Sequence, residues 1–260
     1  MRAGIDVSLL DVVASLALIA LAVAVSFWRK AELEREIGIA VLRSFLQLSA
    51  VGYVIQAIFD SDSLWLVVLL LAVMVGFGSL TARSRARDVP GALPALALAL
   101  SAAAVVTLGL VLALGVFDAK PRFMVPVGGM VIGNAMTAAA VSLNRLADEV
   151  RSSALRIEAT LALGATAAEA ARGLVTRSLR SGMIPLIDST KTTGVVFFPG
   201  TMVGMLLAGA DPIDAVRLQL ILLWTLLGSV ALSSVLATSL AYRGFFTPAH
   251  QLRELPAEKT

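Results

Sequence analysis

Two apolar segments of this sequence carry methionine and amide side chains that could contact a metal ion. The side chains are Met130, Asn134, Met136, Met202 and Met205. Ions such as iron(II) need several nitrogen, oxygen or sulfur ligands. A methionine in an apolar helix is more often a packing residue than a ligand. We therefore assign no metal site and no cofactor from the sequence.

The sequence offers little for enzymatic catalysis. Its only histidine, His250, lies near the C-terminus, where we interpret it as a solvated residue, and no apolar segment pairs a nucleophile with a base. A nucleotide-binding P-loop requires G-x-x-x-x-G-K-[ST], and in Ser189–Thr192 the residue Thr190 replaces the second glycine. We expect no catalytic residues, and any ATP to be hydrolysed by another chain.

The longest polar stretch, residues 144–191, carries twelve charges between two apolar segments. Within it Arg172, Thr176 and Arg180 recur every fourth residue, with Arg177 beside them. Residues four apart share one face of a helix. Arginines gathered there could form charge-assisted contacts with acidic groups on a partner protein.

This polar stretch reads as two helices joined by a short turn. Apolar residues recur every three or four positions over residues 146–163, which predicts one helix continuing from the preceding apolar segment. Gly164 fits its C-terminal stop. Thr166 and Glu169 have the spacing of a capping box that begins the second helix.

The second helix should end close to the next apolar segment. We expect Gly182 and Pro185 to mark its end, because proline interrupts a helix. Asp188 would then lie at the cytoplasmic entrance of a path through the membrane, or pair with Lys191. Lys191 would extend from the membrane edge toward water.

The composition indicates an integral membrane protein. Apolar residues make up 58% of the 260 residues and the mean hydropathy is +0.89, whereas soluble domains contain about 45–50%. A transmembrane helix needs ~20 mostly apolar residues, so we expect an all-α, polytopic transmembrane helix bundle of about seven spans, in one domain over residues 1–260. The charge-free runs are Val12–Trp28, Ser44–Phe59 (extended backwards by Ile37–Leu42), Ser63–Ala82, Val89–Phe117, Phe123–Asn144, Thr192–Ala210 and Leu218–Tyr242.

The charges of successive loops alternate. The loops near Asp60 and Asp211 are acidic, and the loop near Asp118 contains both acidic and basic residues. The remaining loops are basic. Basic loops face the cytoplasm, which predicts an outside N-terminus, a cytoplasmic C-terminus and a location in the plasma (inner) membrane. The net charge of +3 and the pI near 9.7 then reflect membrane topology, with lipid and not nucleic acid as the partner. The basic loops are residues 29–43, 83–88, 144–191 and the C-terminal tail.

Small residues recur in the fifth and sixth predicted spans. Glycines four residues apart let helix backbones approach closely, which alone would explain them as packing residues. Proline, methionine and asparagine occur beside them, and irregular backbone at membrane depth is tolerated where it lines a cavity. We therefore predict that these two spans line a substrate path. The candidate path residues are Met130, Gly133, Asn134, Met136, Pro199, Gly200, Met202 and Gly204.

Several short motifs resemble those of known transporter subunits. Glu158-Ala159-Thr160, followed by Gly164-Ala165, resembles the EAA loop of ABC-transporter permeases, which docks into a groove on the ATPase subunit. A wider set of motifs resembles the FetB-type (YbbM) permease family over about residues 29–252, with Thr201 replacing an expected methionine. The motifs are Pro126-Val-Gly-Gly-Met-Val-Ile-Gly-Asn-Ala-Met136, Leu163-Gly-Ala-Thr166, Asp188-Ser-Thr-Lys-Thr192, Pro199-Gly-Thr-Met-Val-Gly204 and Ala208-Gly-Ala-Asp-Pro212.

The resemblance implies a permease subunit that works with a separate ABC ATPase. One chain supplies one membrane half, so a homodimer with two ATPase copies is expected. Bacterial members of the family are associated with iron export and related plant proteins with aluminium tolerance, which makes a metal ion such as iron the expected cargo. The residues expected to couple to the ATPase are Glu158, Gly164, Ala165, Thr166, Arg172, Arg177 and Arg180.

Two other functions stay open. A secondary transporter, independent of any ATPase, typically places an acidic residue or histidine within the membrane, and the predicted spans contain none. An ABC permease for a nucleotide sugar or another small anion would also fit, with Arg43 or Lys191 as a basic contact.

Overall fold

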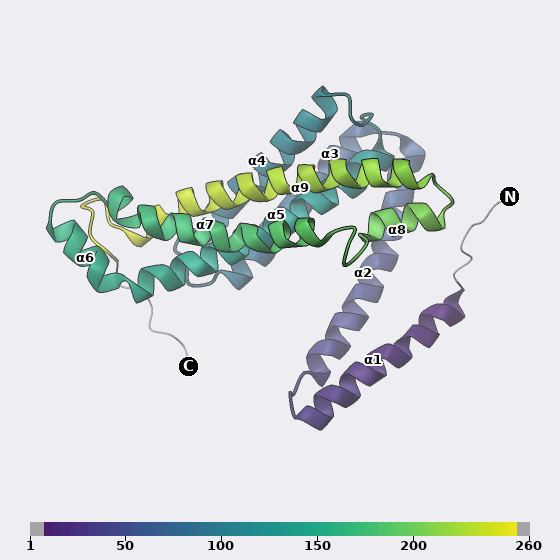
Figure 1. Cartoon of the computed structure of the whole chain (residues 1–260), viewed down its shortest axis with the longest axis horizontal. Coiled ribbons are helices and arrows are strands. Elements are labelled where there is room, and N and C mark those ends of the chain that lie inside the picture. The colour runs from purple at the N-terminus through teal and green to yellow at the C-terminus, as the bar shows by residue number, and fades with distance from the viewer. Residues whose placement is uncertain (1–7, 254–260) are drawn as a thin grey trace.

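The computed structural model describes residues 8–253, which fold into helices joined by short connections (Figure 1). Apart from two isolated bridges, the described residues contain no β-structure. The predicted all-α helix bundle is therefore confirmed. The helices are α1 (Leu9–Arg29), α2 (Glu34–Ser61), α3 (Leu64–Arg85), α4 (Ala92–Ala113), α5 (Pro121–Ser152), α6 (Ala154–Ala162), α7 (Ala167–Thr192), α8 (Gly200–Leu207), α9 (Pro212–Ala241) and the 3-10 helix η1 (Tyr242–Phe245).

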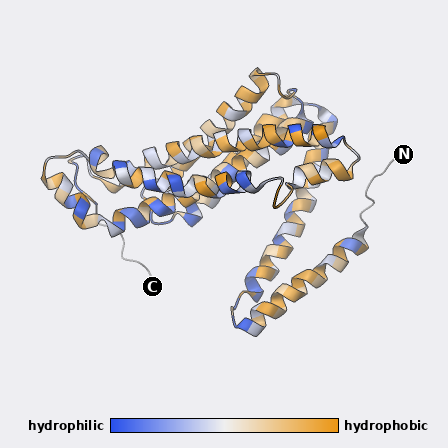
Figure 2. Cartoon of the chain, viewed as in Figure 1, coloured by the Kyte–Doolittle hydropathy of each residue, from blue (hydrophilic) through white to orange (hydrophobic). Residues whose placement is uncertain are grey.

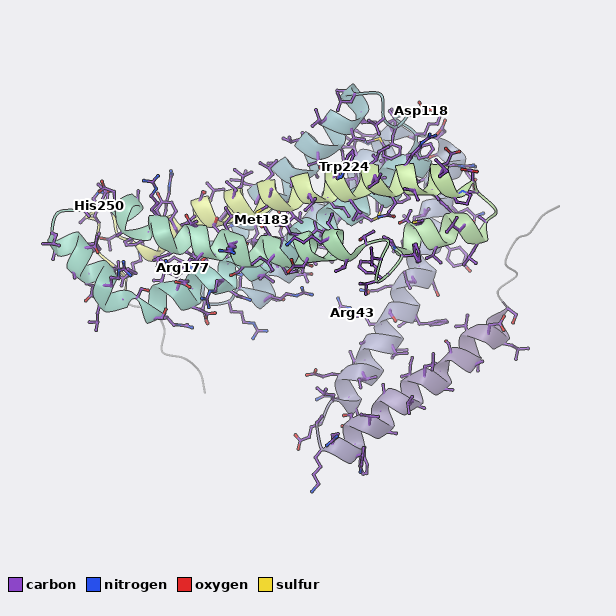
Figure 3. The ribbon with its side chains drawn as sticks, viewed as in Figure 1. Arg43, Asp118, Arg177, Met183, Trp224 and His250 are labelled. Carbon is purple, nitrogen blue, oxygen red and sulfur yellow. The ribbon has the colours of Figure 1, made fainter. Side chains whose placement is uncertain are left out.

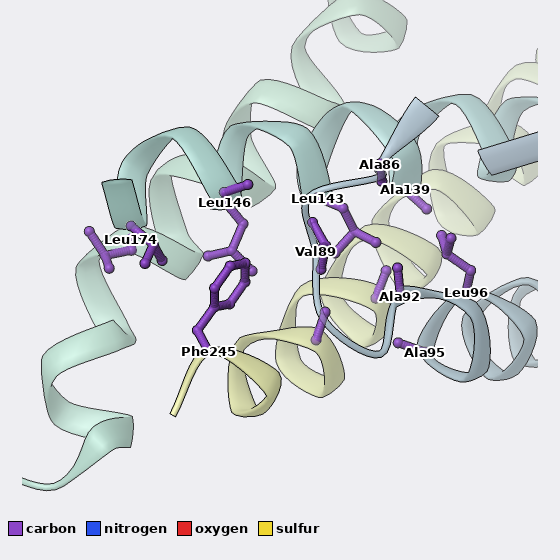
Figure 4. Packing of buried hydrophobic residues seen from close by; sticks show 14 of the residues in the cluster. Ala86, Val89, Ala92, Ala95, Leu96, Ala139, Leu143, Leu146, Leu174 and Phe245 are labelled. Atoms are coloured by element: carbon purple, nitrogen blue, oxygen red, sulfur yellow. The ribbon is translucent and has the colours of Figure 1, made fainter. Parts of the chain in front are cut away.

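Five helices, α3, α4, α5, α7 and α9, pack into the bundle, with α9 against α4, α5 and α7. One buried cluster joins Leu96 of α4 to Ala139 and Leu143 of α5 and extends to Phe245 of η1 (Figure 4). Many of its members are alanines. Small side chains let neighbouring helices approach closely, which is the main source of packing energy between helices in lipid.

The closest approach of α7 to α5 occurs at Gly182. A Cβ atom added to Gly182 would lie 2.7 Å from the carbonyl oxygen of Ala138 and would collide with the hydroxyl of Ser142. Gly182 is thus a packing residue in the middle of α7, and the prediction that it ends the helix is wrong. Pro185 is also inside α7, in a transmembrane setting where neighbouring helices help to accommodate a proline.

Six helices are long and apolar enough to cross a membrane, namely α1, α2, α3, α4, α5 and α9. They correspond to six of the seven predicted spans. The remaining one, Thr192–Ala210, is not a continuous helix, because α7 ends at Thr192 and α8 begins only at Gly200. Gly194 between them has a φ of +84°, which a glycine adopts readily. Figure 1 shows α7, this irregular segment and α8 following one another along α9, where a continuous sixth span was expected.

The connections between helices gather at the two ends of the bundle. The α4–α5 and α8–α9 connections lie at one end, here called the α8 end, whereas α6 and η1 lie at the other, the α6 end (Figure 1). Figure 3 shows Asp118 at the α8 end, and Arg177 and His250 toward the α6 end. By the basic-loop rule the α6 end faces the cytoplasm, and this orientation stays a prediction.

The α1–α2 hairpin stands away from the bundle (Figures 1 and 2). The contacts of α1 are with α2, and α2 reaches the bundle near its C-terminal end, where Ile58 packs with Val67 and Val125. Most of the large apolar side chains of both helices are exposed. In a membrane these faces contact lipid or another protein.

The α5–α7 contact predicts a sharp difference between two glycines of α7. Gly182→Ala should destabilise the protein by about 1–3 kcal/mol, since overpacking forces the helices apart. Gly173→Ala, whose Cβ would touch only an arginine side chain at 3.4 Å, should be neutral or stabilising by up to ~1 kcal/mol through helix propensity. The measurement is the free energy of unfolding in detergent micelles. Equal effects of the two substitutions would contradict the tight contact.

Candidate functional site

The α6–turn–α7 segment, here called the coupling hairpin after its predicted role, closes the α6 end of the bundle. The predicted capping box is confirmed: Thr166 Oγ1 accepts from the Glu169 N–H at 3.3 Å, and Glu169 Oε2 accepts from the Thr166 N–H at 2.8 Å. Gly164 has a φ of +90° and open space around it. These local interactions fix the direction in which α7 begins.

The helix predicted over residues 146–163 is broken at Ser153, so that α6 is separate from α5. The hydroxyl of Ser152 donates to the Glu149 carbonyl at 3.2 Å, and serine hydroxyls compete with the helical backbone in this way. The apolar stripe itself is confirmed, since Leu146, Val150 and Ile157 are all buried. The break turns α6 back toward α7.

A buried carboxylate joins α5 to α7 below the coupling hairpin. Glu149, with a side chain only 8% exposed, accepts from Arg145 at 2.6 Å and from the Nε and Nη2 atoms of Arg177 at 2.7 Å each. A buried charge is tolerated only when it is paired in this way. From the sequence, Arg177 was expected to face a partner. The pairing of Glu149 was not predicted, although Glu149 lies three residues after Leu146, on the buried stripe.

The other predicted coupling residues are exposed, except Ala165, which is half-buried. Glu158, Arg172 and Arg180 point to solvent, and within residues 8–253 none of them forms an ion pair. A cleft of about 210 Å³ separates α6 from α7 and is lined by Arg156, Thr160 and Glu169, with Arg177 at its edge. The hairpin therefore presents both charged groups and a polar hollow at the end of the bundle.

His250 braces the start of α7. Its Nδ1 atom accepts from the Ala167 N–H at 3.2 Å, so it satisfies one of the free amides at the helix N-terminus. The segment that carries it is held by Thr247, whose N–H donates to the Gln251 carbonyl at 2.8 Å. His250 is exposed, as expected, and it also caps this helix start, a role that the sequence did not reveal. No sequence pattern linked the tail to this helix start.

Polar side chains of α5 and α7 line a groove of about 200 Å³ midway along the bundle. Asn134 and Thr137 of α5 face Ser189 of α7 across it, with Gly182 and Pro185 at its floor and edge. The amide nitrogen of Asn134 donates to the Met130 carbonyl at 2.8 Å. Its carbonyl oxygen makes no hydrogen bond within the described part of the chain.

The structure brings together some of the predicted path residues and separates others. Met130 meets α8 through Thr201, whose hydroxyl lies 4.0 Å from its sulfur. Open space adjoins Gly133, Gly200 and Gly204. Met202 is buried, with Pro199 capping its helix. Met136 lies on the opposite face of α5, against Gly78 of α3.

Asp188 and Lys191 lie on α7 next to the groove. Lys191 Nζ is 3.0 Å from Asp188 Oδ1, and Asp188 directly precedes Ser189, which lines the groove together with Asn134. The expected pairing of the two side chains is confirmed, whereas their place at a cytoplasmic entrance stays a prediction. The described residues contain no cluster of three or more histidine, aspartate or glutamate side chains that could hold a metal ion.

Comparisons with known proteins agree over nearly the whole chain. The uncharacterised protein family UPF0014 matches residues 9–246. The UPF0014 membrane protein STAR2 of Oryza sativa subsp. japonica is 41% identical over 248 residues, covering 95% of this chain and 87% of the relative. Protein ALUMINUM SENSITIVE 3 of Arabidopsis thaliana is 38% identical over 240 residues, covering 92% and 88%. The probable iron export permease protein FetB of Escherichia coli (strain K12) is 34% identical over 238 residues, covering 92% of each. No solved structure matches.

Neutralising the buried carboxylate should loosen the contact between α5 and α7. Glu149→Gln is expected to lower the free energy of unfolding by roughly 1–2 kcal/mol, since two half-exposed arginines lose their shared acceptor. Asp148→Asn, at the exposed neighbouring position, should change it by less than about 0.5 kcal/mol. Chemical denaturation in micelles compares the two variants. A larger loss for Asp148→Asn would show that Glu149 does not hold the helices together.

The capping box should be sensitive to acid. Hydrogen bonds from the backbone N–H and hydroxyl of Thr166 lower the pKa of Glu169. A lowered pKa means that the ionised form stabilises the folded state at neutral pH, and that this stabilisation is lost as the pH falls through the lowered value. Thr166→Ala should therefore destabilise the protein at pH 7, and its difference from wild type should narrow in acid.

Thr176→Ala serves as the control for this titration, because the Thr176 hydroxyl bonds only to the Arg172 carbonyl of its own helix. Its effect should be small and independent of pH. Thermal unfolding at a series of pH values measures both variants, and a pH-independent deficit for Thr166→Ala would rule out the ionised cap.

Proposed function

Because this chain belongs to the UPF0014 family, with relatives that include a probable iron export permease, we propose that it is the membrane permease subunit of an ABC transporter, driven by a separate ATPase and exporting a metal ion such as iron. The family and the multi-pass helix bundle support the permease role. The cargo, the direction and the ATPase are inferred from the resemblance.

The observation that carries the proposal is the build of the coupling hairpin. Its turn is fixed by the Thr166–Glu169 box and braced by His250, while its exposed face carries Arg172 and Arg180. A motor protein can move a bundle only through an element that is rigid toward the bundle and accessible from outside. The ion pairs of Glu149 connect this element to α5 and meet the first requirement.

Assembly follows from the architecture of ABC transporters. They have two membrane halves and two ATPases, so we propose a homodimer with two ATPase copies in the plasma (inner) membrane. The N-terminus would lie outside and the C-terminus in the cytoplasm, as the basic loops predict. The arginines of the hairpin would then meet acidic groups on the ATPase through charge-assisted contacts.

The main test reconstitutes the full chain and the separate ABC ATPase in proteoliposomes and measures ATP hydrolysis and transport. A panel of Fe²⁺, Mn²⁺, Zn²⁺ and a sugar nucleotide identifies the cargo class. Stimulation by a metal ion supports the proposal, whereas stimulation only by the sugar nucleotide favours the anion permease. Failure of the chain to stimulate any ATPase turnover argues against an ABC permease.

Gly164→Leu should uncouple ATP hydrolysis by the ATPase from transport by this chain. Its φ of +90° strains any residue with a side chain by about 1 kcal/mol or more, and the new side chain would project from the turn toward the partner. We expect normal membrane insertion with ATP-driven transport reduced at least tenfold. Leu163→Ala, at an adjacent position that is 90% exposed, is the control for side-chain change in the turn and should retain more transport than Gly164→Leu. Full coupling in Gly164→Leu would refute the role of this turn.

A secondary transporter is the second candidate, because the Asp188–Lys191 ion pair lies on α7 next to Ser189, which lines the groove with Asn134. The pair lies outside the predicted spans, which themselves contain no acidic residue or histidine. Transport driven by a proton gradient in vesicles without any ATPase would favour this alternative. If a proton gradient alone drives no transport, and adding the ATPase and ATP restores it, the ABC permease is favoured.

A further inference from the structure

The Asp188–Lys191 ion pair lies on an open face of the bundle. The two charged atoms are 3.0 Å apart, and the side chains are 59% and 69% exposed. Neither side chain contacts another charged group within residues 8–253 at ion-pair distance. The pair is therefore solitary, and its depth in the membrane decides what it can do.

The packing of α7 on α5 gives this depth. Gly182 packs against Ala138 and Ser142, and two turns further along α7 Ser189 lines the same groove as Asn134. Asp188 therefore lies level with Asn134, which is near the centre of the charge-free part of α5. At 1.5 Å per residue, about 15 Å of uncharged helix extends on each side. Figure 3 agrees, since Met183 of α7 already lies midway between His250 and Asp118.

Charges at this depth do not face lipid without a large penalty. A charged side chain at the bilayer centre is costly, and such residues face cavities or protein partners. The backbone supplies a second, independent sign, because α7 ends at Thr192 and residues 193–199 are irregular. Irregular backbone at membrane depth occurs where it is buried in protein or lines water. Both observations place water or a second protein surface on this face.

The groups around the pair favour a cation. The carbonyl oxygen of Asn134 and the hydroxyls of Thr137 and Ser189 line the adjoining groove, which has about 200 Å³ of space. Together with the Asp188 carboxylate these are oxygen ligands, which suit hard divalent ions. An anion would need further positive groups, and no basic residue lies between Arg180 and Lys191 on α7.

We propose that Asp188 is a transient binding site for a divalent metal ion at the middle of the membrane, and that Lys191 is its built-in counter-ion. Lys191 neutralises Asp188 while the site is empty and is displaced when the metal ion binds. A single carboxylate opposed by a lysine gives weak binding, which a transport site needs so that the ion can leave. The proposal rests on the proposed cation transport and names where the cation binds.

The experiment measures Mn²⁺ binding to the full chain in nanodiscs, without ATPase, by electron paramagnetic resonance. Asp188→Asn should weaken binding by at least about tenfold, the usual minimum for loss of a group that supports a metal. Lys191→Met should strengthen it, because the competing charge is gone. Asp148→Asn, an exposed acid of α5 toward the α6 end, is the matched control and should leave binding unchanged.

Each other outcome overturns the site. It is refuted if wild type and Asp188→Asn bind Mn²⁺ equally, or if Lys191→Met binds it more weakly than wild type. Should Asp188→Asn fail to fold, the neutral double variant D188N/K191M leaves no unpaired charge at this position and must also lose the binding, while Asp188→Glu must keep it.

The site and the proposed function fail separately. Metal transport driven by ATP that is unchanged in Asp188→Asn would remove the site and leave the permease. Mn²⁺ binding that depends on Asp188, in a chain that never transports metal with any ATPase, would support the binding site and reject the proposed permease function.

Discussion

The close contact between α7 and α5 at Gly182 sets the position of every functional group along the bundle. Because no side chain separates the two backbones there, the register on either side is fixed. In one direction it brings Arg177 to Glu149, and in the other it brings Ser189 to Asn134. The coupling hairpin and the polar groove thus lie along one helix. Thr166, which caps the start of α7, and Asp188, near its end, thus belong to one continuous helix.

Features determined by neighbouring residues could be predicted from the sequence. Six spans follow from uninterrupted apolar length, and the start of α7 follows from the Thr166–Glu169 spacing, since a capping box closes within one turn. The buried stripe of Leu146, Val150 and Ile157 follows from helical periodicity. In each case the interacting groups are close in sequence, or the contact is with lipid, so that no particular partner residue has to be known.

Features that depend on a partner far away in sequence were missed. A glycine and a proline three residues apart usually end a helix, and only the presence of α5 shows that Gly182 is a contact and that α7 continues. With α7 continuous past Gly182, Asp188 belongs to the same helix as Arg177. The pairing of His250 with Ala167 spans 83 residues and leaves no local trace. Glu149 was detectable, because an acid on a buried stripe requires a cation opposite it.

The weak attachment of the α1–α2 hairpin has a mechanical consequence. Its contacts with the bundle cluster around Ile58, next to Asp62, a non-glycine residue with a φ of +46° that joins α2 to α3. Apart from the α2–α3 connection, the angle between the hairpin and the bundle depends on the packing of α2 against α5 around Ile58. The lateral width of the protein in the membrane therefore depends on this small contact and not only on the core.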